Sequence, residues 1–406
     1  MYFPKQIINS INYLNYFKSF IYKDENLEKK LKKKIQYLFN INKEIKFLGR
    51  ARSGIFLAIK IILKNSINNL VFLSPFTIPE VIDLVLSAGG KPVFLKHEKN
   101  STNLSIKELN KIIKKKPAAL IITHYHVNQK NYKLIHKICK KNQITIVEDC
   151  AISCSGKSDG AYIGSLSDFS VYSFSAFKFI NFFYGGAITY KKKYKKLINE
   201  TTINWKRLSA SHYFKKFIQT LKFDILTNQI IFNLITFKIL KFLSQKQKFI
   251  LNKKVYLDET FKLDKSYFSL LSNSGFKEIY YKTFSYKLNL NHRRFISKIY
   301  LNKLKHITTP KVTNSQKFLS DNEFMHYLII AKSKKHRLKL KNKLLESGFD
   351  VGSFFYADCC KIKKFSKFGN NKSLQSLTDN LITLPTHKRI TKEYAEKLSL
   401  KILELY

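Results

Sequence analysis

Between residues 45 and 190 the sequence alternates between two periodicities. Short apolar runs of strand length recur at LVFLS (70–74), PVFL (92–95), AALIIT (118–123), ITIVE (144–148) and FSVYSF (169–174). Segments in which apolar residues have helical spacing lie between most of these runs, at 53–64, 79–88, 105–115 and 130–141. Strands that alternate with helices predict an α/β fold with a mostly parallel sheet.

Local signals mark the starts of two of these helices. Ser105 followed by Glu108 is a capping box, which satisfies backbone N–H groups in the first turn of a helix. Pro79 suits the first turn of a helix, and the pair Gly89-Gly90 suits the end of the same helix. The sequence therefore predicts helix starts near residues 79 and 105.

Polar residues follow the apolar runs, where the strands are expected to end. These residues are Ser74, Thr123, His124, Asp149, Ser173 and, five positions later, Lys178. In parallel sheets, ligands bind beyond the carboxyl ends of the strands. A carboxylate, a hydroxyl and a lysine are therefore expected to meet at one edge of the sheet.

These three groups match the needs of pyridoxal phosphate. Its aldehyde forms an imine with a lysine, its ring nitrogen pairs with a carboxylate, and its phosphate binds N–H and hydroxyl donors. Asp149 fits the carboxylate role and Ser173 the hydroxyl role, while the helix after GRAR (49–52) offers N–H groups. Lys178 is the candidate imine-forming residue. Taken alone, it would be one surface lysine among many.

Several motifs resemble those of one family, the DegT/DnrJ/StrS sugar aminotransferases. VEDCAISCSGKSDGAYIGSLSDFSVYSFSAFK (147–178) resembles the family stretch from V-I-E-D-A-A through G-S-x-G-D to S-F-x-x-x-K. SPFTIPEVIDLVLSAGGKPVFL (74–95) resembles P-A-Y-T-x-P-x-V-V-D-A-I-x-x-A-G-A-K-P-V-F. GRARSGIFLAIKIIL (49–63) is similar to the first phosphate-side helix, and LITLPTHKRIT (381–391) to the C-terminal L-P-x-H segment. The resemblance is good over 47–190 and weak over the last thirty residues.

The resemblance implies a fold-type I pyridoxal phosphate enzyme. It implies that Lys178 forms the Schiff base and acts as general acid and base. It also implies that Asp149 pairs with the pyridinium nitrogen and that Ser173 binds the phosphate. Ala51 and Arg52 occupy the positions where the family has Gly-Thr at the phosphate.

Two further positions are implied near the cofactor, and two depart from the family pattern. Phe76 stands at a common aromatic position, and His124 matches the histidine that follows the preceding strand. Ile152 replaces a glutamine beside the cofactor, and Phe183 adds bulk where the family has glycine. These departures leave open a catalytically degenerate or altered protein.

The implied reaction transfers an amino group from glutamate to a keto sugar nucleotide, for surface polysaccharide or related glycan biosynthesis. The implied assembly is a homodimer in which Asn289 or Asn291 reaches the phosphate in the other subunit. A sugar dehydratase is the alternative within the same class, although the known lysine-less dehydratases lack the equivalent of Lys178. The sequence does not name the sugar, the aminated carbon or the donor.

We predict three parts in the chain: a large α/β cofactor-binding domain with an N-terminal helical segment (1–200), a helical Phe/Lys-rich insertion (201–280) and a small C-terminal α+β domain (281–406). The insertion either packs on the body or on a partner subunit, or rests as a basic amphipathic segment on an anionic membrane. The small domain is expected to contain helices at 292–306, 333–347 and 391–403 and a strand at 326–331.

The formal net charge of +47 attracts phosphates and acidic membranes without specificity. Lys, Asn, Ile, Phe and Tyr are all frequent, which is typical of an AT-rich genome, and the lysines are spread along the whole sequence. Neither a Cys/His finger spacing nor an aromatic RNP-like strand occurs, so no nucleic-acid partner is expected, and a nucleic-acid binder remains the minor alternative.

The five cysteines form no metal-type CxxC pair, so no metal is expected and a reducing compartment is indicated. Cys150 and Cys154 are expected to be small core residues. The N-terminal MYFPKQIINSINYLNYF lacks an uninterrupted apolar core and a small-residue cleavage site. A cytoplasmic location is therefore expected.

Overall fold

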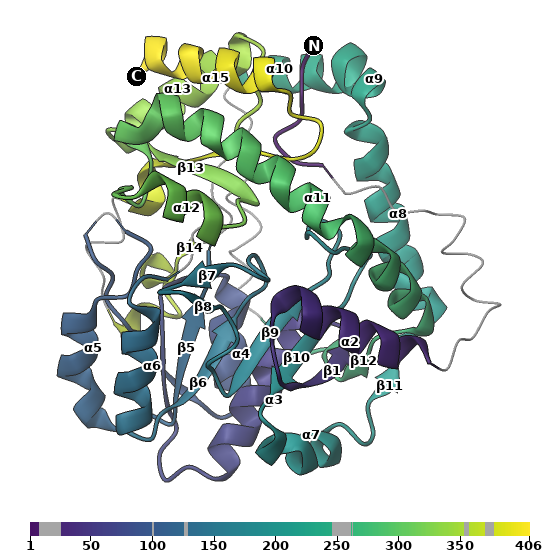
Figure 1. Cartoon of the computed structure of the whole chain (residues 1–406), viewed down its shortest axis with the longest axis vertical. Coiled ribbons are helices and arrows are strands. Elements are labelled where there is room, and N and C mark those ends of the chain that lie inside the picture. The colour runs from purple at the N-terminus through teal and green to yellow at the C-terminus, as the bar shows by residue number, and fades with distance from the viewer. Residues whose placement is uncertain are drawn as a thin grey trace.

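The computed structural model describes residues 1–7, 26–99, 101–125, 129–245, 261, 263–352, 357–369 and 377–406. A nine-stranded sheet occupies the lower half of the molecule (Figure 1). In spatial order its strands are β11 (Lys206–Arg207), β12 (Ser269–Leu270), β1 (Glu44–Leu48), β10 (Gly186–Tyr190), β9 (Phe169–Ser173), β6 (Thr145–Asp149), β5 (Ala119–Thr123), β2 (Leu70–Leu73) and β4 (Lys91–Phe94).

The neighbouring strands β4, β2, β5, β6 and β9 run parallel to one another. Strand β10 is antiparallel to both β9 and β1. Each of the five strands predicted from an apolar run is present, with bounds that differ by at most one residue. The predicted α/β fold with a mostly parallel central sheet is confirmed.

Helices cover both faces of this sheet. One hydrophobic core joins the sheet to α3 (Ala51–Lys64) and α4 (Pro79–Ser87). A second core joins its other face to α5 (Ile106–Ile112) and α6 (Tyr132–Lys141). This layered arrangement places the connections on the faces and leaves the carboxyl ends of the parallel strands open for a site.

The predicted helix signals are present. Pro79 is the first residue of α4, and the Ser105 side chain accepts a hydrogen bond from the Glu108 N–H at 3.3 Å. Helix α6 begins at Tyr132, two residues later than predicted, because Asn131 has a left-handed backbone with φ of 56°.

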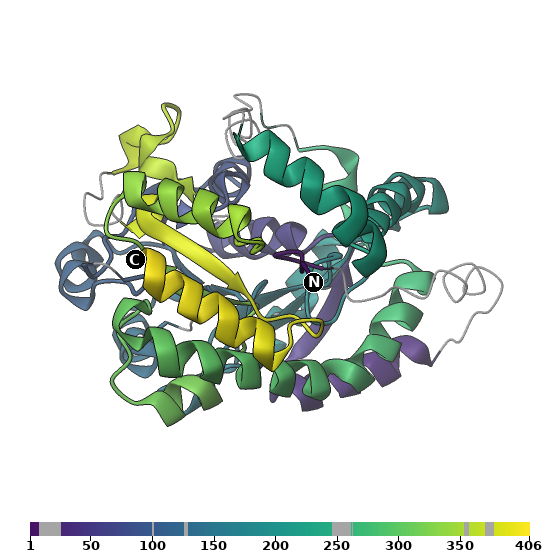
Figure 2. The ribbon, with the colours of Figure 1, turned by 90° about the horizontal axis from the view of Figure 1, so that it is seen from above.

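The upper half of the molecule contains α12 (Ser315–Asp321), β13 (His326–Ile330), α13 (Lys334–Glu346), β15 (Leu381–Pro385) and α15 (Lys392–Leu405). Strands β13 and β15 pair antiparallel, and β15 runs close to α15 in their shared core (Figure 2). These elements confirm the strand predicted at 326–331 and the helices predicted at 333–347 and 391–403.

A 32-residue helix, α11 (Asn273–Leu304), joins the two halves. It begins where the Ser272 side chain accepts a hydrogen bond from the Gly275 N–H at 3.1 Å. The helix predicted at 292–306 is the C-terminal part of this longer helix, which ends at Leu304, since neither Gly nor Pro interrupts it after Gly275.

The segment 201–280 is mostly helical and contains α8 (Ala210–Leu226), α9 (Gln229–Ile231), η3 (Phe232–Thr236) and α10 (Phe237–Gln245). Helix α8 rises along one side of the molecule, and α9 and α10 continue beside the N-terminus (Figure 1). The prediction of a helical segment is correct only in part, because the segment also contains two short strands. Strand β12 pairs with β1 at the edge of the sheet, and β11 pairs with β12. The three-part division of the chain stays a prediction, although its boundary at 281 falls inside α11.

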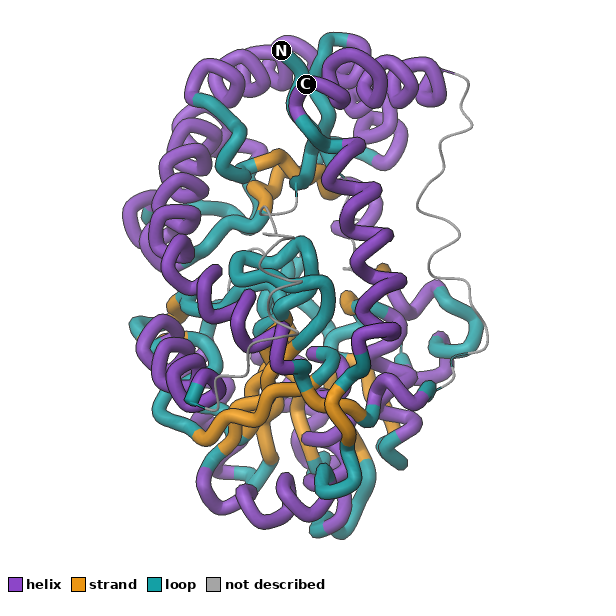
Figure 3. The backbone as a smooth tube through the Cα atoms, turned by 90° about the vertical axis from the view of Figure 1, so that its right-hand side faces the viewer, coloured by secondary structure: helices purple, strands orange, loops and turns teal. Residues whose placement is uncertain are grey.

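Shorter elements complete the described chain; they are α2 (Leu27–Phe39), α7 (Lys195–Thr201), β3 (Phe76–Thr77), β7 (Lys157–Ser158), β8 (Ala161–Tyr162), β14 (Ala357–Asp358), η1 (Ile113–Lys115), η2 (Lys192–Tyr194), η4 (Lys265–Tyr267), η5 (Lys305–Ile307), η6 (Cys359–Lys361) and η7 (Ser366–Phe368). Figure 3 shows the strands gathered mainly in the lower half, with long helices along the sides.

The carboxylate of Glu323 ties the upper half to the loop after β6. It accepts hydrogen bonds from the Ser153 hydroxyl at 2.6 Å, from the Ser155 N–H at 3.1 Å, and from the Cys154 N–H and the Tyr286 hydroxyl. Glu323 is 2% exposed, so its donors have little access to water as an alternative partner. This buried network fixes the loop that follows the end of β6.

We expect Glu323→Ala to lower the free energy of unfolding by about 2–4 kcal/mol, because several buried donors lose their acceptor. Urea unfolding would measure the change. Glu323→Gln, which keeps one acceptor oxygen, should lose less, and Glu346→Ala at an exposed position of α13 should have little effect. Equal stability of Glu323→Ala and Glu346→Ala would contradict this role.

Candidate active site

Three adjacent parallel strands end at the predicted site. Thr123 ends β5, Asp149 ends β6 and Ser173 ends β9. Thr123 pairs in register with Asp149, and Asp149 with Val171, so the three strand ends are neighbours. Lys178 lies in the loop between β9 and β10, where its N–H donates to the Ser175 carbonyl at 2.9 Å.

The side chains of Lys178 and Asp149 lie close enough for their charges to interact. Burial lowers the pKa of Lys178, and the carboxylate of Asp149 opposes this shift. Burial raises the pKa of Asp149, and the Ala151 N–H at 3.0 Å, Lys178, His124 and Arg52 oppose that rise. The four ionisable residues predicted from the sequence therefore lie close enough to act on one another.

A buried network lies beside Asp149. His124 is fully buried, its N–H donates to the Asp149 carbonyl at 3.0 Å, and its Nε2 donates to Glu148 at 2.7 Å. Glu148 also accepts from the Tyr132 hydroxyl at 2.8 Å and from the Gly164 N–H at 2.7 Å. Burial would raise the pKa of Glu148, but the hydrogen bonds from the histidines hold it well below its usual range. His124 thus connects an ionised carboxylate to the end of β6.

Three cations gather at the N-terminus of α3. Arg52 pairs with Glu80, and Arg50 lies between the rings of Tyr184 at 4.7 Å and Tyr267 at 4.6 Å. Burial opposes the charge on Arg52, but Glu80 and the tyrosine side chains raise its pKa. Helix N-termini also carry partial positive charge from their unpaired N–H groups, so this corner of the site favours anions.

The third cation, Lys216, comes from α8. Its Nζ lies 5.5 Å from the centre of the Tyr184 ring, on which Arg50 also packs. Burial lowers the pKa of Lys216, and the charges of Arg50 and Arg52 lower it further. Repulsion of this kind is relieved when an anion binds among the cations.

The same corner has the features that a phosphate needs. Ser53, in the first turn of α3, is fully buried, and its hydroxyl has no hydrogen-bond partner among the described residues. Gly186 of β10 lets the helix start approach closely, because a Cβ there would lie 2.4 Å from the Ala51 backbone N and Cα. The predicted phosphate positions Ala51 and Arg52 therefore fit an anion site with α3 donors and nearby cations.

Phe76 lies in β3 and is fully buried. Its ring centre is 4.9 Å from that of Tyr125, whose hydroxyl donates to the Phe76 carbonyl and lies 3.0 Å from the Ser74 hydroxyl. Burial raises the pKa of Tyr125, and the charge of Asp149 adds to this rise. Phe76 is thus held next to the site through Tyr125, and its contact with a cofactor stays a prediction.

The two departures from the family pattern, Ile152 and Phe183, are buried. Ile152 and Phe183 belong to one hydrophobic core with the loop after β9. Phe183 packs edge-on against Phe217 of α8, with ring centres 5.6 Å apart. In the same loop, Phe177 packs against Phe223 of α8 at 4.8 Å. The bulk at 183 is therefore used to seat the inserted helix.

The remaining predicted positions have simpler surroundings. The Ser173 hydroxyl is mostly buried and lies 3.4 Å from the Ser175 hydroxyl. Asn289 and Asn291 both lie in α11, and neither is singled out by a contact. Cys150 and Cys154 are buried and unoxidised, as expected for small core residues. His124, Glu148 and Cys150 have ligand atoms within 4.8 Å of one another, although His124 and Glu148 already bond to each other.

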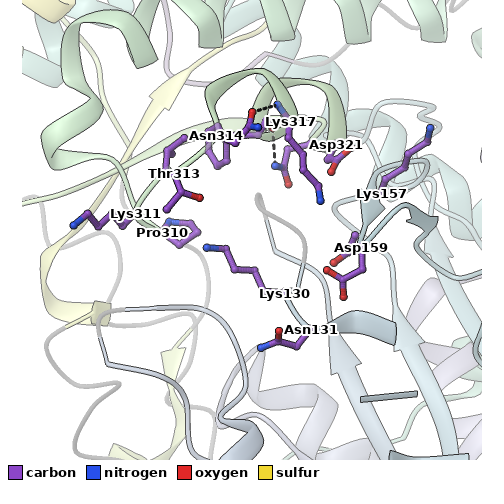
Figure 4. A pocket seen from close by; sticks show the side chains of 14 residues that line it. Lys130, Asn131, Lys157, Asp159, Pro310, Lys311, Thr313, Asn314, Lys317 and Asp321 are labelled. Atoms are coloured by element: carbon purple, nitrogen blue, oxygen red, sulfur yellow. Dashed lines mark hydrogen bonds between the residues drawn. The ribbon is translucent and has the colours of Figure 1, made fainter. Parts of the chain in front are cut away.

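A cavity of about 240 Å³ lies elsewhere, between the β7 region and the segment from Pro310 to α12 (Figure 4). Its lining includes Lys130, Lys157, Lys311 and Lys317 together with Asp159 and Asp321. It contains none of the predicted site residues.

Sequence reasoning missed several residues of the site. Arg50 stood within the quoted GRAR motif, but nothing local indicated its stacking between two tyrosines. Lys216 and Tyr267 belong to the least alignable part of the chain, and only the tertiary structure brings them to α3. The pairing of Glu148 with His124 carried a weak signal, since Glu148 ends one apolar strand run and His124 follows another.

Removing the Asp149 carboxylate should lower the pKa of Lys178 further, because the carboxylate favours the charged ammonium. A lower pKa leaves more neutral amine at a given pH, so acetylation of Lys178 in Asp149→Asn should begin at lower pH. Mass spectrometry across a pH series would measure this. Asp159→Asn, at an exposed position in the other cavity, is the matched control. An unchanged profile in Asp149→Asn would contradict the coupling.

Residues 28–203 match the model of the DegT/DnrJ/EryC1/StrS aminotransferase family, which confirms the resemblance seen in the sequence. GDP-perosamine synthase of Vibrio cholerae is 25% identical over 118 residues, 29% of this chain and 32% of that protein. UDP-4-amino-4,6-dideoxy-N-acetyl-beta-L-altrosamine transaminase of Helicobacter pylori is 26% identical over 120 residues, 30% of this chain and 32% of that protein. The matched segments thus span only about a third of these relatives.

Solved structures extend the likeness of fold to the whole chain. Helicobacter pylori PseC, an aminotransferase involved in the biosynthesis of pseudoaminic acid, superimposes with a TM-score of 0.74 at 14% identity, covering 100% of this chain and 99% of that one. The PLP-form of a putative sugar aminotransferase of Streptococcus pneumoniae gives 0.71 at 14% identity, with both chains covered at 100%. The chain therefore has the fold of these fold-type I aminotransferases, and the likeness in sequence to the DegT/DnrJ/EryC1/StrS aminotransferase family covers residues 28–203.

Proposed function

We propose that this protein is a pyridoxal phosphate-dependent aminotransferase that transfers an amino group to the keto carbon of a nucleotide-activated sugar. The observation that carries the proposal is the buried meeting of Lys178 with Asp149 at the ends of parallel strands. An anion site at the start of α3 lies within electrostatic reach, because the charge of Arg52 acts on both residues. An amine, a carboxylate and an anion site in one place match the three chemical needs of this cofactor.

When bound, pyridoxal phosphate supplies an electron sink for the carbon that loses its proton. The residues of this chain have separate tasks. Burial lowers the pKa of Lys178, and its Nζ would accept a proton and return it. Asp149 would hold a negative charge at the ring nitrogen, fixed by the Ala151 N–H.

Binding and exclusion of water fall to other elements. The first turn of α3, with Arg52 and Lys216 nearby, would hold the phosphate. The aromatic contacts of Phe177 and Phe183 with α8 cover the loop that carries Lys178. Such cover reduces water access and strengthens the electrostatic interactions beneath it.

The substrate class is supported by the names of the relatives, which include GDP- and UDP-linked sugar enzymes. A basic chain also suits a diphosphate-bearing substrate. Glutamate as the donor, a role in surface polysaccharide or related glycan biosynthesis, a homodimer in which Asn289 or Asn291 serves the other subunit, and a cytoplasmic location belong to the same proposal and rest on the family resemblance.

The test is transfer of label from ¹⁵N-glutamate to keto sugars linked to GDP, UDP or dTDP, followed by mass spectrometry. Protein incubated with pyridoxal phosphate should also gain a visible absorbance band that borohydride abolishes. Lys178→Ala should lose both the band and the transfer, because Lys178 is the lysine whose charge acts on Asp149.

Lys130→Ala, in the separate cavity, should keep both properties. A protein that stays colourless with pyridoxal phosphate would exclude the proposed enzyme. A coloured protein without transfer to any keto sugar would favour the altered activity that Ile152 and Phe183 left open.

Lys216→Ala should raise the Kd of pyridoxal phosphate about tenfold, the usual effect of losing one charged hydrogen bond. Pyridoxal, which lacks the phosphate, should bind both proteins equally. Fluorescence or absorbance titration would measure both ligands. Lys222→Ala, on the exposed side of the same helix, is the matched control. An equal loss of affinity for the two ligands would show that Lys216 supports the fold rather than binds the phosphate.

A further inference from the structure

The helices of the insertion expose apolar side chains to solvent. We call residues 214–243, from α8 to α10, the arch. Large apolar side chains of the arch that are 46–70% exposed are Phe214, Ile225, Leu226, Ile230, Leu234, Ile235, Ile239 and Phe242. Monomeric soluble proteins rarely gather so many exposed apolar residues in one segment, and such patches mark interaction surfaces.

The opposite face of the arch is firmly packed. Phe217, Phe232 and Phe237 are at most 9% exposed. Tyr2 stacks on Phe237 with ring centres 4.0 Å apart, and the Lys241 ammonium donates to the Glu346 carbonyl at 3.1 Å. The arch is therefore anchored to the body by one face, and its exposed apolar face does not result from a missing core.

Among the described helices, no single one is long and apolar enough to cross a membrane. The pair Lys216–Leu226 and Gln229–Leu243, bent by 57°, reaches the length and composition of a span. Because the inner face of this pair is fixed to the protein, the geometry favours helices that lie in the plane of a surface. Amphipathic helices of this kind bury one face at the boundary between lipid headgroups and acyl chains.

The polar residues of the arch indicate the charge of the partner. Lys222 and Lys238 are exposed among the apolar side chains, and Lys216 and Lys241 are partly exposed. Asp224, the one acidic residue between 214 and 243, is half-buried. A second copy of this chain would bring the same lysines against the first, which disfavours pairing through this face.

We propose that the exposed face of the arch binds an anionic phospholipid surface, with its apolar side chains in the headgroup layer and its lysines on the acidic headgroups. Lys222 and Lys238 supply the electrostatic attraction, and Leu234, Ile235 and their neighbours supply the apolar contact. The contact places the protein on a membrane without a spanning helix.

Vesicle sedimentation tests this with the full chain and two kinds of liposome, pure phosphatidylcholine and phosphatidylcholine with phosphatidylglycerol. The protein should sediment with the anionic vesicles and much less with the neutral ones. Leu234→Glu/Ile235→Glu should lower the bound fraction at limiting lipid about tenfold, since two apolar contacts are lost and two negative charges are added. The matched control Ile67→Glu/Leu86→Glu changes two exposed apolar residues outside the arch and should bind like the parent.

A second pair of double variants distinguishes binding through the arch from attraction by the overall positive charge of the protein. Lys222→Glu/Lys238→Glu should weaken binding more than Lys114→Glu/Lys115→Glu, which makes the same change of charge at exposed positions far from the arch. Equal weakening by the two pairs, or sedimentation unaffected by Leu234→Glu/Ile235→Glu, would overturn the proposal. So would light scattering that finds the parent dimeric and Leu234→Glu/Ile235→Glu monomeric, because the face would then join two copies.

Discussion

The ammonium of Lys178 and the carboxylate of Asp149 meet at a sheet edge where burial disfavours both charges. Buried opposite charges stabilise a fold only when their geometry is good and their other lone pairs and protons are satisfied. Here the Ala151 N–H holds Asp149, and His124 links the strand end to Glu148. The parallel register of β5, β6 and β9 brings these groups together, so the arrangement of the sheet determines the chemistry of the site.

Helix α8 packs on Phe183, one of the positions that depart from the family pattern. A glycine at this position leaves space, whereas the phenylalanine fills it and packs on Phe217 of the insertion. Lys216, one residue before Phe217, then points its charge toward the arginines at α3. Helix α8 therefore both covers the lysine loop and brings a cation to the anion site.

Much of this arrangement follows from local sequence. Apolar runs fixed the strands to within a residue, and polar residues after those runs located Asp149, Ser173 and His124 at one edge because parallel strands share their direction. Contacts between segments far apart in the sequence could not be predicted from local patterns of this kind. Lys216 reaches the site through the packing of α8, and Glu323 reaches the 153–155 loop from 168 or more residues away. The strand pairing of β12 was hidden for the same reason, since Leu270 pairs with Leu48 of β1 and both residues of β12 pair with β11.

The two faces of α8 have opposite environments, and this contrast links the site to the surface of the molecule. Its inner face carries Phe217 and Phe223, which pack on the loop that holds Lys178. Its outer face carries Phe214 and Ile225, which are exposed by 59% and 46%. A helix that only covered the lysine loop would need polar residues on its outer side for solubility. The apolar outer side therefore has no explanation in the site itself, whereas the proposed contact with lipid would explain it.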